Sequence, residues 1–202
     1  MQHWIDIEGT LDRFDKKRSY SGSTLLHVAS RFNLHSVVEV LLSLDEIDAN
    51  PENDLGMSPL HHAAGNGHEA IVRLLLKRND IKVNLRDFRC RTPLSYASWH
   101  GHETVVRLLL ERAEIEADPV DREDMTPLCL AVRSGHETVV RLLLERDDVM
   151  VDSMGLGATT PLFFVKENEA MARLLLQRND VNAGFKDDWN RTPLHVAAEG
   201  GP

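Results

Sequence analysis

Histidine has the clearest chemical potential in this sequence, because its side chain binds metals and exchanges protons near neutral pH. The chain contains ten histidines. His61 and His62 are adjacent in the sequence. His100 and His102 are separated by one residue. Neither pair has a third ligand at the spacing of a zinc site, so we expect no metal site.

The cysteines and carboxylates also lack a catalytic arrangement. Cys90 and Cys129 form no CxxC pair, and two cysteines cannot build a disulfide framework. Paired carboxylates such as Asp147-Asp148 fall in a predicted loop, where water solvates them. The sequence has no nucleophile elbow, phosphate loop, zinc helix or dinucleotide fingerprint. We therefore expect no catalytic residue and no cofactor, and we do not expect an enzyme.

The charge balance narrows the choice of partner. The chain has 202 residues, with 23 Lys and Arg against 32 Asp and Glu, which gives a formal net charge of −9. An acidic chain gains little from phosphate backbones or anionic membranes, so we expect neither nucleic acid nor membrane as partner. Met1 to Asp6 lack the basic start and apolar core of a secretory signal. Together with the free thiols, this predicts an intracellular protein, cytoplasmic or nuclear.

An internal repeat supplies the elements that would position these residues. A Thr/Ser-Pro-Leu type string recurs at a nearly constant interval, beginning at Thr24, Ser58, Thr92, Thr126, Thr160 and Thr192. An Arg-Leu-Leu-Leu string recurs in the same frame, beginning at Arg73, Arg107, Arg141 and Arg173. Residues 101–112 and 135–146 are identical over twelve positions. The pattern indicates duplication of one structural unit.

Each unit reads as a short helix, a turn, a second helix and a long loop. Threonine or serine before proline is a helix start, and glycine then breaks the first helix. The second helix has a broad apolar face. Acid-first pairs four residues apart are expected to form ion pairs on its surface: Glu69–Arg73, Glu103–Arg107, Glu137–Arg141 and Glu169–Arg173. The fifth unit is two residues shorter, which predicts a shortened turn between its helices.

These strings resemble the ankyrin repeat family, in which Thr-Pro-Leu-His, small residues, Gly-His and a Val/Leu-rich helix recur with a fixed period. Repeats that share such a twelve-residue stretch look most similar to the near-identical arrays of fungal multi-repeat proteins. The resemblance implies an all-α solenoid of stacked helix-turn-helix units with β-hairpin loops. It also implies structural roles for two sets of histidines. His27, His61 and His195 would bond backbone and threonine groups, and His68, His102 and His136 would stabilise the Gly-His turn.

The repeat also sets the predicted organisation of the chain. We expect five units near residues 20–53, 54–87, 88–121, 122–155 and 156–187, and a partial sixth unit over 188–202. The sixth unit either belongs to a longer array or serves as a cap. Residues 1–19 do not match the repeat, and we expect an N-terminal cap there, with a separate functional tail as the alternative. We expect a monomer, or weak self-association through the uncapped C-terminal repeat.

Residues that differ between units are free to recognise a partner. By the resemblance, contacts come from the hairpin tips and the concave side of the first helices. Aromatic residues, methionine and arginine are enriched at interface centres. The candidate partner-binding residues are therefore Leu55, Met57, Phe88, Arg89, Arg91, Tyr96, Trp99, His100, Arg122, Met125, Arg133 and Trp189. We expect Trp99 to be partly exposed, whereas Tyr96 and Phe164 either belong to this surface or fill space between units.

The sequence leaves three functions open. The first is a non-catalytic scaffold that binds a protein or a peptide. The second is a small-molecule binder or enzyme, for example in fungal biosynthesis, with a concave pocket near His62, Tyr96, Trp99 and His100. The third is a purely structural array without a selected partner.

Overall fold

The computed structural model describes residues 21–44, 46–155, 157–165 and 168–199. The helices of this part are α2 (Leu25–Arg31), α3 (His35–Leu42), α4 (Pro59–Gly65), α5 (Glu69–Leu76), α6 (Pro93–His100), α7 (Glu103–Leu110), α8 (Pro127–Ser134), α9 (Glu137–Leu144), η1 (Pro161–Phe164), α10 (Glu169–Leu176) and α11 (Pro193–Glu199). The predicted N-terminal cap over 1–19 lies outside the described residues. None of the helices in the described ranges is both long enough and apolar enough to cross a membrane.

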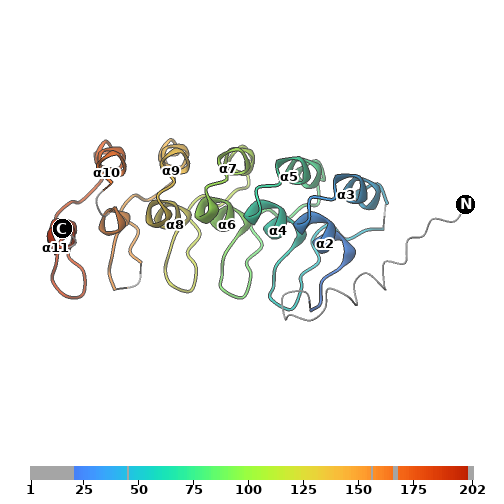
Figure 1. Cartoon of the computed structure of the whole chain (residues 1–202), viewed down its shortest axis with the longest axis horizontal. Coiled ribbons are helices and arrows are strands. Elements are labelled where there is room, and N and C mark those ends of the chain that lie inside the picture. The colour runs from blue at the N-terminus through green and yellow to red at the C-terminus, as the bar shows by residue number, and fades with distance from the viewer. Residues whose placement is uncertain (1–20, 45, 156, 166–167, 200–202) are drawn as a thin grey trace, which may run out of the picture.

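The helices form two rows along the long axis of the molecule (Figure 1). One row holds α2, α4, α6, α8 and α11, and the other holds α3, α5, α7, α9 and α10. Loops extend from the first row, away from the second row (Figure 1). They turn as hairpins, but the described residues form only one isolated bridge, between Gly155 and Thr159. The all-α stack of helix pairs predicted by the sequence is confirmed.

The first helices α2 and α4 start where hydroxyl and histidine side chains meet. The His27 Nδ1 accepts a hydrogen bond from the Thr24 backbone N–H at 3.0 Å and lies 2.9 Å from its hydroxyl. The His27 Nε2 donates to the Met57 carbonyl of the next loop at 2.9 Å. His61 repeats these contacts with Ser58, which confirms the structural role predicted for this motif position. The histidine thus joins its own helix to the following unit.

A second set, the turn histidines His68, His102 and His136, joins each unit to the preceding one. Each Nε2 donates to the carbonyl of a residue in or next to the end of the preceding first helix, at 2.9 to 3.0 Å. Gly101 has a φ of 74°, and a Cβ there would lie 2.4 Å from the His136 Nδ1. Glycine is therefore required both by the backbone conformation and by the close approach of the ring.

The core lies between the two rows. In α5, Ile71, Val72 and Leu75 are fully buried, and the same pattern recurs in α7 and α9. In the first row, small residues such as Ala63 and Ala97 are also fully buried, so that neighbouring helices approach closely. Each unit buries its apolar face against its neighbours, as expected for a repeat array.

The long loops are joined by a ladder of side chains that recurs once per unit, which we call the loop ladder. The Asn50 Nδ2 donates to the Asp80 carbonyl at 2.9 Å, and its Oδ1 accepts from the Lys82 backbone N–H at 2.7 Å. Asn84 makes the same two contacts with the next loop. Asp118 stands at the third position, where a carboxylate replaces the amide, and its Oδ1 is buried without a hydrogen-bond partner.

The fifth unit departs from the pattern in its first helix. Pro161–Phe164 is a single 3₁₀ turn, so the missing residues shorten the helix itself and not only the turn that follows it. Asn168 stands at the position of the turn histidines. Its Oδ1 caps α10 at the Met171 N–H, and its Nδ2 donates to the Glu137 carboxylate at 3.0 Å.

This exchange changes one predicted ion pair. The predicted pairs of Glu69, Glu103 and Glu169 with the arginine four residues on are present. The predicted Glu137–Arg141 pair is not among the ion pairs of the described residues, because the Glu137 carboxylate bonds Asn168 instead. The prediction for that pair was wrong, since the helix surface pattern alone does not show the neighbouring unit.

Candidate partner-binding surface

Three side chains near the end of α6 form an aromatic platform, which we define as Tyr96, Trp99 and His100. The Trp99 and His100 rings stack, with centroids 5.0 Å apart and an interplanar angle of 24°. The Tyr96 and Trp99 centroids are 6.4 Å apart. Trp99 is 37 % exposed, which confirms the expectation that this side chain reaches the surface. The equivalent positions of the neighbouring units hold Gly65 and Arg133.

A buried arginine contacts the platform. The Arg91 guanidinium lies 4.6 Å from the Trp99 ring centroid, within cation–π distance. Its Nε donates to the Asp121 carboxylate at 2.8 Å. Because both partners of this ion pair are buried, the guanidinium is fixed, and it holds the indole that contacts it. Trp99 is thus an exposed aromatic ring on a rigid support.

Tyr96 is held by a second acid of the hairpin loops. Its hydroxyl donates to the Asp87 Oδ2 at 2.7 Å, and the ring is half-buried. Burial, followed by this hydrogen bond, raises the pKa of Tyr96. Tyr96 therefore stays neutral and packs between α6 and the hairpin, while Trp99 and His100 form the outer part of the platform.

His100 is exposed, and its pKa is lowered first by burial of part of the ring and then by His102 and His136. A lowered pKa favours the neutral imidazole. The neutral ring stacks on Trp99 without bringing a second positive charge close to Arg91. This arrangement favours apolar and aromatic contacts over proton transfer.

The hairpin tips present further candidates. Leu55, Phe88, Arg89 and Arg122 are exposed, as the sequence predicts for tip residues. Trp189 is 68 % exposed, with the Arg191 guanidinium 5.2 Å from its ring centroid. The tips of adjacent hairpins are linked, because the Arg122 N–H donates to the Arg89 carbonyl at 2.9 Å.

Two candidates are not on the surface. Arg91 is 4 % exposed and Met125 is 2 % exposed, so the expectation that they lie on the exposed face was wrong. Arg91 is drawn inward by Asp121. Met125 packs in a small cluster with Cys129, Leu130 and the half-buried Phe164. Arg91 and Met125 hold the same position in their repeats, at the base of the hairpin, where the next unit covers them.

The two remaining candidates differ in exposure. Met57 is half-buried, and its carbonyl accepts from the His27 Nε2. Arg133 is exposed near the end of α8, with its guanidinium 6.0 Å from the Phe164 ring centroid. Phe164 therefore fills space between the fourth and fifth units, one of the two alternatives left open by the sequence.

The acids that shape the hairpins were not among the residues predicted from the sequence. The Asp87 Oδ1 accepts from the backbone N–H groups of Arg89 and Arg91, at 2.9 and 2.8 Å. Asp121 does the same one unit further on, and its other oxygen binds Arg91. The signal was available, because Asn53, Asp87, Asp121 and Asp187 all stand five residues before a Ser or Thr that starts a first helix.

The four residues of the alternative small-molecule site do not share an environment. His62 is buried, and burial as the main cause lowers its pKa to about 3, so it is unsuited to proton exchange near neutral pH. Trp99 and His100 are exposed, whereas Tyr96 is half-buried. No group of three metal-ligating side chains occurs among the residues that the structure describes.

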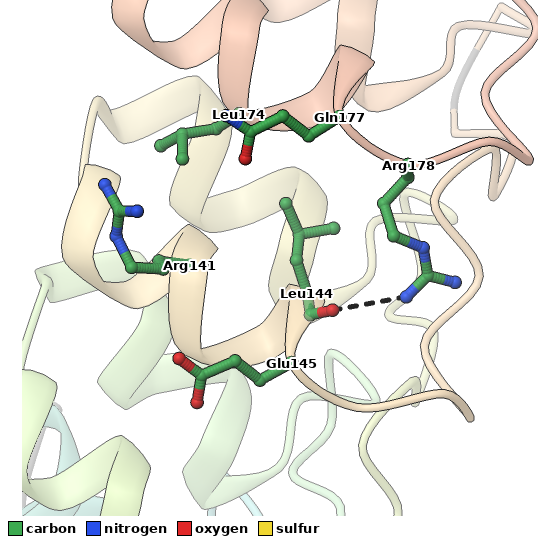
Figure 2. Close-up of a pocket in the computed structure, with 6 residues that line it drawn as sticks. All are labelled: Arg141, Leu144, Glu145, Leu174, Gln177 and Arg178. Atoms are coloured by element: carbon green, nitrogen blue, oxygen red, sulfur yellow. Dashed lines mark hydrogen bonds between the residues drawn. The ribbon is translucent and has the colours of Figure 1, made fainter.

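The structure has cavities in other places. One of about 170 Å³ lies between α9 and α10 and is lined by Arg141, Leu144, Glu145, Leu174, Gln177 and Arg178 (Figure 2). There the Arg178 Nη1 donates to the Leu144 carbonyl at 3.2 Å. A second cavity, of about 760 Å³, is apolar and is lined by η1, α10 and α11. Neither cavity contains a residue of the predicted small-molecule site.

Two rows of short helices, with histidine contacts that join the first four units to one another, define a helical repeat protein of the solenoid class. A sequence model of ankyrin repeats, in three copies, matches residues 5–87 and 84–154. The chain belongs to the ankyrin repeat family. None of the curated proteins compared with it matches. The predicted similarity to fungal arrays stays a prediction. Ankyrin repeats are generally protein–protein interaction modules.

Proposed function

We propose that this chain is a non-catalytic scaffold that binds a protein or peptide partner through the aromatic platform and the neighbouring hairpin tips. The observation that carries the proposal is Trp99, a large aromatic side chain that is exposed although it rests on the buried Arg91–Asp121 pair. Tryptophan and arginine are the residue types that most often dominate binding energy at interfaces.

The platform is suited to binding because it is already ordered. Arg91 and His100 hold the Trp99 ring, and Asp87 holds Tyr96. A side chain that is fixed before binding loses little conformational entropy when a partner covers it. The stacked units add rigidity over a longer surface, since histidine hydrogen bonds connect the first four units to one another.

A capture experiment with matched variants tests the proposal. The full chain is immobilised, proteins are captured from a cell lysate, and each captured protein is quantified for the wild type and for Trp99→Ala. We expect the affinity for a specific partner to fall by at least about tenfold, as for a central aromatic contact. Val40→Ala is the control, because Val40 is also an exposed apolar residue but lies on α3, in the other row.

The outcomes separate the functions. A partner lost with Trp99→Ala and retained with Val40→Ala supports the proposal. A partner retained by both variants would move the binding site to another surface. If a small-molecule library raises the thermal midpoint and His100→Ala removes the shift, the alternative small-molecule function is favoured.

A further inference from the structure

The arginines of this protein fall into two groups by their partners. On the second helices and the loops that follow them, most arginines pair with nearby carboxylates, as Arg73 does with Glu69 and Arg146 with Asp148. On the first-helix and hairpin face, Arg89, Arg122 and Arg133 are exposed, and none of them occurs in an ion pair of the described residues. The chain has a net charge of −9, so carboxylates are in excess. The guanidinium groups of these three arginines are nevertheless available to bind a carboxylate of a partner.

Two of these arginines hold the same repeat positions as two exposed aromatic residues. Arg133 stands one full repeat after Trp99, and Arg122 stands one full repeat after Phe88. Both steps lead from the third unit to the fourth, whose first helices α6 and α8 pack against each other. Along the axis of the array, an aromatic side chain is therefore followed by a cation twice, once on the first helices and once at the hairpin tips.

The distance between these positions sets a spacing on the partner. Packed helices have axes roughly 8–10 Å apart, so equivalent side chains of adjacent units are separated by about that distance. An extended peptide in the polyproline II conformation advances about 3.1 Å per residue with three residues per turn, so side chains three residues apart lie on the same face, about 9 Å from each other. A segment that runs along the array brings one side chain to Trp99 and the side chain three residues away to Arg133.

We infer that the partner presents an extended segment in which an apolar side chain and a carboxylate stand three residues apart, the apolar one on Trp99 and the carboxylate on Arg133. This inference rests on the proposed function and adds the chemistry of the segment. Guanidinium and carboxylate form paired hydrogen bonds, which favours Asp or Glu at that position. A nucleic acid is disfavoured because two isolated arginines form no continuous basic stripe.

The test is selection from a library of random twelve-residue peptides displayed on phage, with the full chain as bait. We expect the bound peptides to share an apolar residue with Asp or Glu three positions away, in either chain direction. One selected peptide and its partner with Lys at the acidic position are then synthesised. Their affinities for the chain are measured by fluorescence anisotropy.

Charge reversal provides the matched controls. In the variant Arg133→Glu, the acidic peptide is expected to bind about tenfold more weakly, and the Lys peptide to bind better than it does to the wild type. Arg141→Glu is the control, since Arg141 is also exposed and outside the ion pairs of the described residues, but lies on α9. Its affinity for the acidic peptide should equal that of the wild type.

The results distinguish this inference from the proposed function. Selected peptides that need Trp99 but show no acidic residue at that spacing would overturn the inference and leave the proposed function standing. Peptides whose binding survives Trp99→Ala would overturn both. A library that yields no binding peptide would overturn recognition of an extended segment, while the capture experiment still decides whether a folded protein binds.

Discussion

Asp118→Asn is expected to stabilise the protein at neutral pH. At the equivalent positions of the loop ladder, the amides of Asn50 and Asn84 donate to a carbonyl of the next loop. The ionised Asp118 carboxylate has no proton to donate, and its Oδ1 is buried without a partner. The Asp118 Oδ2 accepts from the Met150 N–H and the Ser153 hydroxyl, at 3.3 and 3.0 Å. An asparagine keeps these contacts through its oxygen and adds the missing donor.

The size of the effect follows from the contacts. A restored hydrogen bond contributes about 0.5–1.5 kcal/mol, and relief of an unsatisfied buried oxygen adds to it, so we expect a gain of about 1–2 kcal/mol. In a chain of this size, each kcal/mol raises the thermal midpoint by about 2–4 °C. The reciprocal variant Asn84→Asp should lose a similar amount, because it removes the donor from an intact rung.

The pH dependence gives a second check on the same reasoning. Burial is the main cause that raises the pKa of Asp118 above its ordinary value of 3.8. Because the pKa of Asp118 is higher in the folded protein than in the unfolded chain, protonation of this carboxyl stabilises the fold. This stabilisation is complete below pH 3.8 and is lost as the pH rises through the folded-state pKa. The advantage of Asp118→Asn should therefore grow with pH over this range and then stay constant towards pH 7.

Unfolding by urea, followed by circular dichroism at several pH values, measures this advantage. A midpoint for Asp118→Asn equal to or below that of the wild type at pH 7 would refute the reasoning. An advantage that did not change between acid and neutral pH would show that the carboxyl proton is not involved.

Three further predictions concern the histidine contacts and the buried ion pair. His62→Gln should make the free energy of unfolding fall less steeply as the solution is acidified. Because the pKa of His62 is lowered in the folded protein, the contribution of the neutral ring to stability is complete above pH 6.5 and is lost as the pH falls. The loss amounts to at most about 1.4 kcal/mol per pH unit, and urea midpoints at several pH values measure it. Gly101→Ala should lower the free energy of unfolding by about 1–2 kcal/mol or more, and by more than Gly135→Ala does. Both glycines have a positive φ, but of the two only Gly101 faces the turn histidine of the next unit. Equal thermal midpoints for the two variants would contradict this steric argument. Asp121→Ala should cost about 3–5 kcal/mol by leaving the Arg91 charge buried and unpaired, and a change below about 1 kcal/mol in the same denaturation assay would rule this out.

The repeat architecture was predictable because its determinants are local. Thr24 and His27 are three residues apart, and their contact needs only the helix start that the sequence shows. The same is true of Ser58 and His61. Repetition then adds the neighbouring unit, since each motif position meets its equivalent on the next helix. The helix pairs and the structural histidines could therefore be read from spacing.

The candidate surface was less predictable because burial at the hairpin base depends on the next unit. Arg91 looks like an exposed charge in the sequence, but Asp121 lies thirty residues further on and accepts its hydrogen bond. Met125 has the same repeat position and is covered by Phe164. Variation between units signals recognition only at positions that no neighbour covers, and spacing alone does not show which these are.

The replacement of a turn histidine by Asn168 affects how the array responds to force. The first four units are connected at this position by imidazole-to-carbonyl hydrogen bonds, whereas Asn168 bonds a surface carboxylate of α9 instead. With only a 3₁₀ turn as its first helix, the fifth unit has the least helical backbone of the five. If the molecule were stretched along its length, the fourth and fifth units would separate before the other units do. The array would therefore extend first at this junction, near its C-terminal part.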